Sequence, residues 1–206
     1  MGDAVIFNVK FNSLVTTYKN NPLYFEKIQT EKIEEGIIKI TLSWIDSIKF
    51  KDKIVKREPR IVDAILFEEY KKLIVFSDSE SEVNYFVIKI SQYLKFEVSE
   101  ILLFEKIFNN CLLKRMSDVK IIALNIKNKY GEEKIINILD EYKKEKINEI
   151  INDKNVQIIS LTIGLKRNLN FFLDKRSIIS TPDNLKGKET IELYEELIKI
   201  YDKIYI

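Results

Sequence analysis

The sequence contains no histidine and only one cysteine, Cys111. The lack of histidine excludes Ser-His-Asp and Cys-His nucleophiles, histidine acid–base catalysis and nearly all catalytic zinc sites. A single cysteine cannot form an internal disulfide, which predicts a reducing compartment. The N-terminus shows no basic segment before an apolar run, so we expect the protein in the cytoplasm. Cys111 lies in an apolar stretch and is interpreted as a packing residue.

Glycine and proline are also scarce, with five and three occurrences among 206 residues. Such a composition argues against disorder and against long linkers. No Gly-x-Gly-x-x-Gly or Walker-type loop occurs, which excludes nucleotide binding by those routes. No apolar run approaches the ~20 residues of a membrane-spanning helix, so we expect no membrane partner.

Excess charge of either sign is lacking, because 34 basic residues oppose 32 acidic ones and leave a net charge of +2. Binding to a polyanion would therefore have to come from local segregation of charge. The apolar fraction of 46% is ample for a buried core.

Alternation of apolar and polar residues predicts the strands. Residues 5–11 and 38–44 alternate strictly, and the ladder after Trp44 continues or turns at Asp46-Ser47. Further strands are predicted at residues 61–67, 73–76, 119–126, 156–165, 169–173 and 177–180.

Helices are predicted where apolar residues recur three or four apart. The strongest pattern covers residues 79–94, where Ser79 and Glu82 match a capping box and Val83 to Leu94 supply one apolar face. A second helix is predicted at 23–35, with Pro22 near its start and Gly36 at its end. The others are predicted at residues 99–116, 132–152 and 188–205.

This order of elements predicts an α+β fold built from two tandem units. Each unit reads strand, helix, three or four strands, helix, in residues 1–97 and 118–206, and residues 98–117 form a connector helix. The units would share one antiparallel-rich sheet with helices on one side, in one compact body. In element order alone, the chain resembles the saddle of the TATA-binding protein, whose concave sheet meets DNA. The resemblance implies a similar topology and transfers no site residue.

Two basic clusters give the clearest functional signal. Residues 49–60 hold six basic residues against Asp52 and Glu58, and further basic pairs lie in two turns of the second unit. Lysines and arginines along a sheet neutralise phosphates, and Phe50, Phe171 or Phe172 would lie near the bases. We therefore expect a non-catalytic module that binds the backbone of DNA or RNA. The predicted contacts are Lys49, Lys51, Lys53, Lys56, Arg57, Arg60, Lys166, Arg167, Lys175 and Arg176. The competing interpretation is solvated charge on edge strands and turns.

Two other functions remain open from the sequence. The apolar helix at 99–116, or a sheet edge, is a candidate contact for a protein partner or for self-association. Asp63 with Glu69, Tyr70 and Lys71 loosely matches the Asp…Glu-x-Lys arrangement of metal-dependent nucleases. Because Glu-x-Lys arises often by chance here, we assign no catalytic residue, metal ligand or cofactor.

Overall fold

A computed structural model describes most of the chain. The described residues are 2–11, 25–45, 47–50, 53–56, 59–112, 119–138, 149–150, 152–165, 169–182 and 187–203. Side chains are described throughout these ranges except at 47–50, 53–56 and 111–112.

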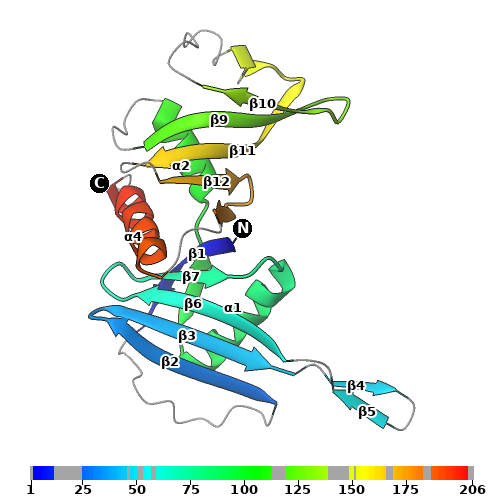
Figure 1. The fold of residues 1–206 in the computed structure, drawn as a ribbon, viewed down its shortest axis with the longest axis vertical. Coiled ribbons are helices and arrows are strands. Elements are labelled where there is room, and N and C mark those ends of the chain that lie inside the picture. The colour runs from blue at the N-terminus through cyan, green and yellow to red at the C-terminus, as the bar shows by residue number, and fades with distance from the viewer. Residues whose placement is uncertain are drawn as a thin grey trace. The chain divides into compact units, whose positions relative to one another are not determined.

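The described chain has an α+β fold and divides into two compact units. Residues Ala4–Ile101 form the first unit, and residues Met1–Asp3 with Leu102–Ile206 form the second. Each unit contains an antiparallel sheet, and helices follow or precede its strands in the chain (Figure 1). The predicted α+β class is confirmed.

The sheet of the first unit is antiparallel throughout, in the order β8-β1-β7-β6-β3-β2. The helix described in this unit, α1, spans Glu80–Leu94 and lies between β7 and β8 in the chain. The strands are β1 (Gly2–Lys10), β2 (Glu26–Glu34), β3 (Ile37–Trp44), β6 (Arg60–Phe67), β7 (Lys72–Phe76) and β8 (Glu97–Glu100). Two further strands, β4 (Ser47–Phe50) and β5 (Lys53–Lys56), pair with each other in a separate two-stranded sheet.

The core of the first unit forms where α1 packs on one face of this sheet. Alternate residues of β6, namely Val62, Ala64 and Leu66, are buried on that face. The helix contributes Val83, Phe86, Ile90 and Leu94, which are four of the five predicted apolar positions, and the fifth, Val87, is partly buried against the same core. The helix predicted over 79–94 is therefore confirmed.

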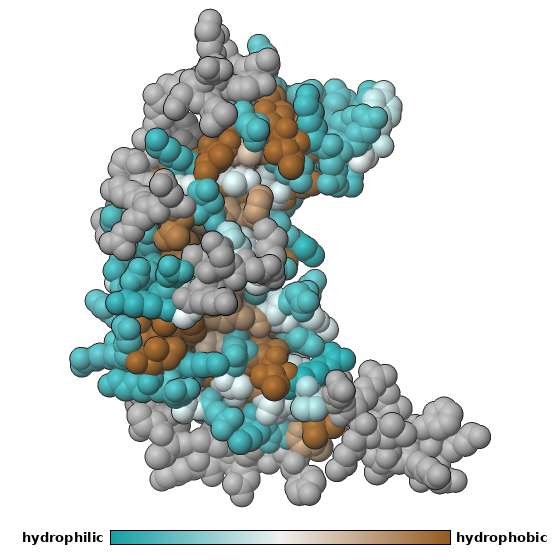
Figure 2. Space-filling model, in the orientation of Figure 1, coloured by the Kyte–Doolittle hydropathy of each residue, from teal (hydrophilic) through white to brown (hydrophobic). Residues whose placement is uncertain are grey.

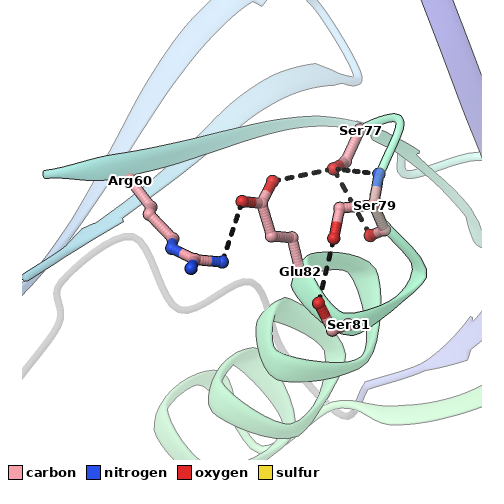
Figure 3. A network of polar contacts seen from close by, with 5 residues as sticks. All are labelled: Arg60, Ser77, Ser79, Ser81 and Glu82. Carbon is pink, nitrogen blue, oxygen red and sulfur yellow. Dashed lines mark hydrogen bonds and ion pairs between the residues drawn. The ribbon is translucent and has the colours of Figure 1, made fainter. Parts of the chain in front are cut away.

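The capping box predicted at the start of α1 is wrong (Figure 3). Ser79 occupies the N-cap position, but its hydroxyl makes no capping hydrogen bond and lies 2.9 Å from the Ser81 hydroxyl. Ser77 takes the polar role instead: its Oγ accepts a bond from the Ser79 N–H at 3.1 Å and donates to Glu82 Oε2 at 2.9 Å. Glu82 is thereby directed to Ser77 and away from the backbone of Ser79.

The helix predicted at 23–35 is wrong, because residues 26–34 form strand β2. The pairing of β2 with β3 supplies hydrogen bonds that a local helix would otherwise make. Gly36 has a φ of 75° in the tight turn between these strands, and a bulge lies between Lys32 and Glu34. A glycine in the left-handed region beside a bulge is typical of a hairpin turn. The prediction that Gly36 ends a helix is therefore wrong as well.

The second unit has a five-stranded antiparallel sheet within its described residues, in the order β10-β9-β11-β12-β13. Its strands are β9 (Val119–Asn128), β10 (Glu133–Asn137), β11 (Val156–Leu165), β12 (Asn170–Asp174) and β13 (Ile179–Thr181). Helices α2 (Leu103–Leu112) and α4 (Lys188–Lys203) contact each other, and α2 contacts β9. Gly2 and Asp3, at the start of β1, bond to β13: Ser180 Oγ donates to Asp3 Oδ1 at 2.6 Å, and Thr181 Oγ1 to the Gly2 carbonyl at 3.4 Å.

Two more predicted helices need correction. The helix predicted at 132–152 begins as strand β10, which pairs with β9, and most of its remainder lies outside the described residues. In the stretch predicted as a helix at 99–116, β8 ends at Glu100 and α2 begins at Leu103, while residues 113–116 lie outside the description. The final helix, α4, and the strands β9, β11 and β12 are where the sequence predicted them. In the described part of the chain, no helix has the length and apolar character needed to cross a membrane.

Candidate nucleic-acid interface

The first basic cluster lies in and beside the hairpin of β4 and β5. This hairpin leaves β3 after Trp44 and returns to β6 at Arg60, and these two residues pair across the two strands (Figure 1). Lys49 lies in β4, and Lys53 and Lys56 lie in β5. These three lysines therefore belong to one small two-stranded sheet, inserted between β3 and β6 in the chain. Lys51 and Arg57 of the same cluster lie outside the described residues.

Arg60 is tied to the body of the first unit. Its Nη1 donates to Glu82 Oε1 at 3.2 Å, and the Arg60 side chain is 38% exposed (Figure 3). Glu82 also accepts the bond from Ser77, so Arg60 helps to connect β6 to the start of α1. Of the basic residues predicted in this cluster, Arg60 therefore has a structural partner that the sequence did not reveal.

The second basic cluster lies in the second unit. Lys175 and Arg176 are exposed in the turn between β12 and β13. Asp174 organises that turn, because its Oδ1 accepts the backbone N–H of Arg176 at 2.8 Å and its Oδ2 pairs with Arg176 Nε at 2.9 Å. Lys175 makes no ion pair with another described residue. Lys166 and Arg167 lie outside the described residues.

The two phenylalanines near this cluster point to opposite faces of their sheet. Phe171 is fully buried and pairs with Ile163 of β11, whereas Phe172 is 41% exposed and pairs with Thr162. Strand alternation explains the difference, because neighbouring residues alternate between the faces of a sheet. Only Phe172 of this pair is accessible to a nucleic-acid base. The Phe50 side chain is not described.

Asp63, the centre of the nuclease interpretation, takes part in a polar group on the first sheet. The Thr41 hydroxyl donates to Asp63 Oδ1 at 2.6 Å, and Lys39 Nζ lies 2.9 Å from Asp63 Oδ2. Glu69 lies beyond the end of β6, in the turn before β7. Among the described residues, no three Asp, Glu or Cys side chains are grouped closely enough to hold a metal ion. Nothing in this geometry favours a nuclease.

The apolar residues of α2 are largely accounted for by its own unit. Leu103, Phe104 and Ile107 are buried, and Phe104 stacks on Phe108 with ring centroids 5.9 Å apart. Leu102, just before the helix, is 57% exposed. Figure 2 shows that apolar side chains interrupt the hydrophilic surface at separate places. Scattered exposed apolar residues are normal for a folded domain, so they give no specific support to a partner site on α2.

A buried carboxylate, which the sequence did not predict, connects β2 to α1. The Glu26 side chain is fully buried, Lys89 Nζ lies 2.7 Å from Glu26 Oε1, and both Tyr85 and Tyr93 donate hydroxyl bonds to the same carboxylate. Burial alone would raise the pKa of Glu26, but these three donors outweigh it and hold the pKa below 4.5. Trp44 packs on Tyr85 with centroids 4.7 Å apart. The spacing of Tyr85, Lys89 and Tyr93 along one helix line was the available sequence signal.

No protein-family model matches the sequence, and no curated protein matches it.

Proposed function

We propose that the protein is a non-catalytic module that binds the phosphate backbone of DNA or RNA, chiefly through the β4–β5 hairpin. The observation that carries the proposal is the concentration of cations in this hairpin. Residues 49–60 hold six basic residues and two acidic ones, whereas the whole chain is nearly neutral. Phosphate neutralisation depends on such local segregation of Lys and Arg.

The hairpin is a longer connection than the fold requires to join β3 to β6. Antiparallel neighbours are commonly joined by a turn of two residues, and β2 and β3 are joined in that way. The connection from Trp44 to Arg60 instead contains a second small sheet. An isolated two-stranded sheet is marginally stable in water, so the insertion adds little to the fold. A binding role explains both its presence and its charge.

The wider form of the proposal is a tandem arrangement of two related units resembling the TATA-binding protein saddle, with the second cluster around Lys175 as an additional contact. In its support, a helix follows a run of antiparallel strands in each unit, α1 after β7 and α4 after β13. Against it, the inner helix predicted at 23–35 is strand β2, and the helix predicted at 132–152 begins as strand β10 and is helical only at residues 149, 150 and 152 among those described. We therefore place the main contact on the hairpin. A cytoplasmic location and the absence of a cofactor belong to the same proposal.

The test is the salt dependence of binding to a labelled DNA duplex and to a labelled single-stranded RNA, measured by fluorescence anisotropy. The triple variant Lys49→Glu, Lys53→Glu, Lys56→Glu removes three cations from the hairpin. For a duplex, each lost phosphate contact reduces the slope of log K against log salt concentration by about 0.9. We expect the slope to fall by roughly 3 and the affinity at low salt to fall by more than tenfold.

A matched control changes three exposed lysines outside the hairpin and outside β2, Lys95, Lys134 and Lys154, to Glu. This control alters net charge by the same amount, so it separates a local contact from bulk electrostatics. The proposal is wrong if the two triple variants lose affinity equally, or if the wild-type protein binds neither nucleic acid at low salt.

A further inference from the structure

Strand β2 forms one margin of the first sheet. Among the described strands, β3 is its only neighbour in the strand order (Figure 1). The two strands pair without interruption from Glu26 to Lys32, and the bulge follows after Lys32. Over this regular stretch β2 offers a straight edge to another strand.

The hydrogen bonds to β3 show which backbone groups face that edge. The Phe25 carbonyl accepts the Ile45 N–H at 3.1 Å, so Phe25 belongs to a hydrogen-bonded pair. In an antiparallel ladder such pairs alternate along the strand. The N–H and C=O groups of Glu26, Ile28, Thr30 and Lys32 therefore point away from β3. Outward groups of this kind are a template for pairing with another strand.

The side chains that alternate with these outward backbone groups are exposed, and the charged ones make no ion pair with a described residue. Phe25 is 45% exposed and Ile33 is 40% exposed. Lys27 and Glu31 are exposed, and neither makes an ion pair in the described part of the chain. This edge thus carries two exposed apolar side chains and two opposite charges that make no ion pair with a described residue.

We propose that β2 pairs edge to edge with β2 of a second copy of this chain, antiparallel, about a two-fold axis at Gln29. The sequence of the edge is self-complementary about that residue. In this register Phe25 of each chain lies opposite Ile33 of the other, and Lys27 lies opposite Glu31. Lys27 and Glu31 occupy non-hydrogen-bonded positions of the new ladder, where facing side chains approach most closely, while Phe25 and Ile33 flank the regular stretch at its two ends. The two-fold axis makes each contact twice.

Charge and apolar matching select this register. Moving the axis to Ile28 places Phe25 opposite Glu31, and moving it to Thr30 places Lys27 opposite Ile33. Parallel pairing in register places each charge beside its own copy, which is destabilising. Only the axis at Gln29 matches both charges and both apolar residues. Charged residues usually block pairing at a sheet edge, whereas in this register they favour one partner, the same chain.

The contact between the two strands is small, so the dimer that it forms is weak. One pair of short strands buries less than the 1,200–2,000 Å² that is typical of stable complexes. The dimer is therefore weak, depends on protein concentration, and is weakened further by salt because both ion pairs are exposed. No nucleic acid takes part, so the inference is independent of the proposed function.

Sedimentation velocity over a wide concentration range at low salt, with the full chain, tests the pairing by charge exchange. Lys27→Glu alone sets two acidic side chains opposite each other at both symmetry-related contacts, and Glu31→Lys alone sets two basic side chains opposite each other there. Each single variant is expected to raise the dimer dissociation constant at least about tenfold. In a mixture of the two variants, one chain carries Glu at both positions and the other carries Lys at both, so both contacts of a mixed dimer are ion pairs and the mixture is expected to recover dimerisation. The double variant Lys27→Glu, Glu31→Lys restores both ion pairs with their signs exchanged and is expected to dimerise like the wild type.

Lys134→Glu, which makes the same charge change as Lys27→Glu on exposed strand β10, serves as the matched control and should leave the dissociation constant unchanged. Recovery of the dimer in the double variant also shows that neither substitution prevents folding. Three results overturn the inference: a wild-type monomer at every concentration, single variants that dimerise as well as the wild type, or a double variant that remains as monomeric as the single ones.

Discussion

At the scale of single residues, Glu26 is the most constrained charge in the described part of the first unit. Its carboxylate is fully buried and accepts bonds from Lys89, Tyr85 and Tyr93. Removing one partner of a buried ion pair leaves the other charge uncompensated. The cluster joins the first residue of β2 to successive turns of α1, so its loss should weaken the packing of the strand on the helix.

We expect Glu26→Ala to lower the free energy of unfolding at neutral pH by about 3 kcal/mol, measured by urea denaturation. Glu34→Ala, at an exposed position of the same strand, should stay within about 0.5 kcal/mol of the wild type. The pH dependence gives a second measure. Because the folded-state pKa of Glu26 lies below 4.5, its stabilising contribution is present above that pH and is lost as the pH falls through the folded-state pKa.

The difference in stability between the wild type and Glu26→Gln should therefore narrow as the pH falls below about 4.5. A difference that is constant with pH would show that the charge of Glu26 contributes nothing, and that only the shape of its side chain matters.

At the scale of elements, the start of α1 depends on Ser77 more than on Ser79. The Ser77 hydroxyl bonds to both the Glu82 carboxylate and the Ser79 N–H, whereas the Ser79 hydroxyl makes no capping bond. Hydrogen bonds to charged groups contribute about 1.5–3 kcal/mol. We expect Ser77→Ala to lower the free energy of unfolding by about 1.5 kcal/mol and Ser79→Ala by less than about 0.5 kcal/mol. Thermal unfolding followed by circular dichroism compares them, and a larger loss in Ser79→Ala would restore the capping box.

The elements also show what the sequence determines and what it leaves to tertiary contacts. Helix α1 and strand β3 were predicted because each carries an apolar face of one clear period, which the core then buries. The sequence of β2 does not predict a strand, because most of its residues are exposed. Exposed positions need not alternate between apolar and polar residues as the positions of a half-buried strand do. Strand β2 forms because it pairs with β3, and strand β10 forms because it pairs with β9. Local propensity gives way to such long-range pairing.

The sequence also predicts only part of the candidate interface. The concentration of lysines in residues 49–60 is a property of the sequence, and the pairing of β4 with β5 places three of them in one hairpin. The partner of Arg60 could not be predicted, because Glu82 lies 22 residues away in a different element. The opposite orientations of Phe171 and Phe172 follow from the register of β12 with β11, which a single sequence does not specify.

At the scale of the whole molecule, the first residues of the chain belong to the second unit. Residues Met1–Asp3 group with Leu102–Ile206, while the rest of β1 belongs to the first unit. The hydrogen bond from Ser180 Oγ to Asp3 Oδ1, at 2.6 Å, fixes this arrangement across 177 positions of sequence. A contact of that separation forms only when the second unit folds around the N-terminal residues.

Replacing Asp3 should therefore affect one unit selectively. In Asp3→Ala the Ser180 hydroxyl loses its acceptor, and we expect faster amide hydrogen exchange in β12 and β13, by roughly fivefold for a loss of about 1 kcal/mol. Exchange in β3 and β6 of the first unit should not change. Asp78→Ala, at an exposed position of the first unit, is the control and should leave β12 and β13 as in the wild type. Equal acceleration in β3 and β13 of Asp3→Ala would contradict the assignment, because it would mean that the first residues stabilise both units together.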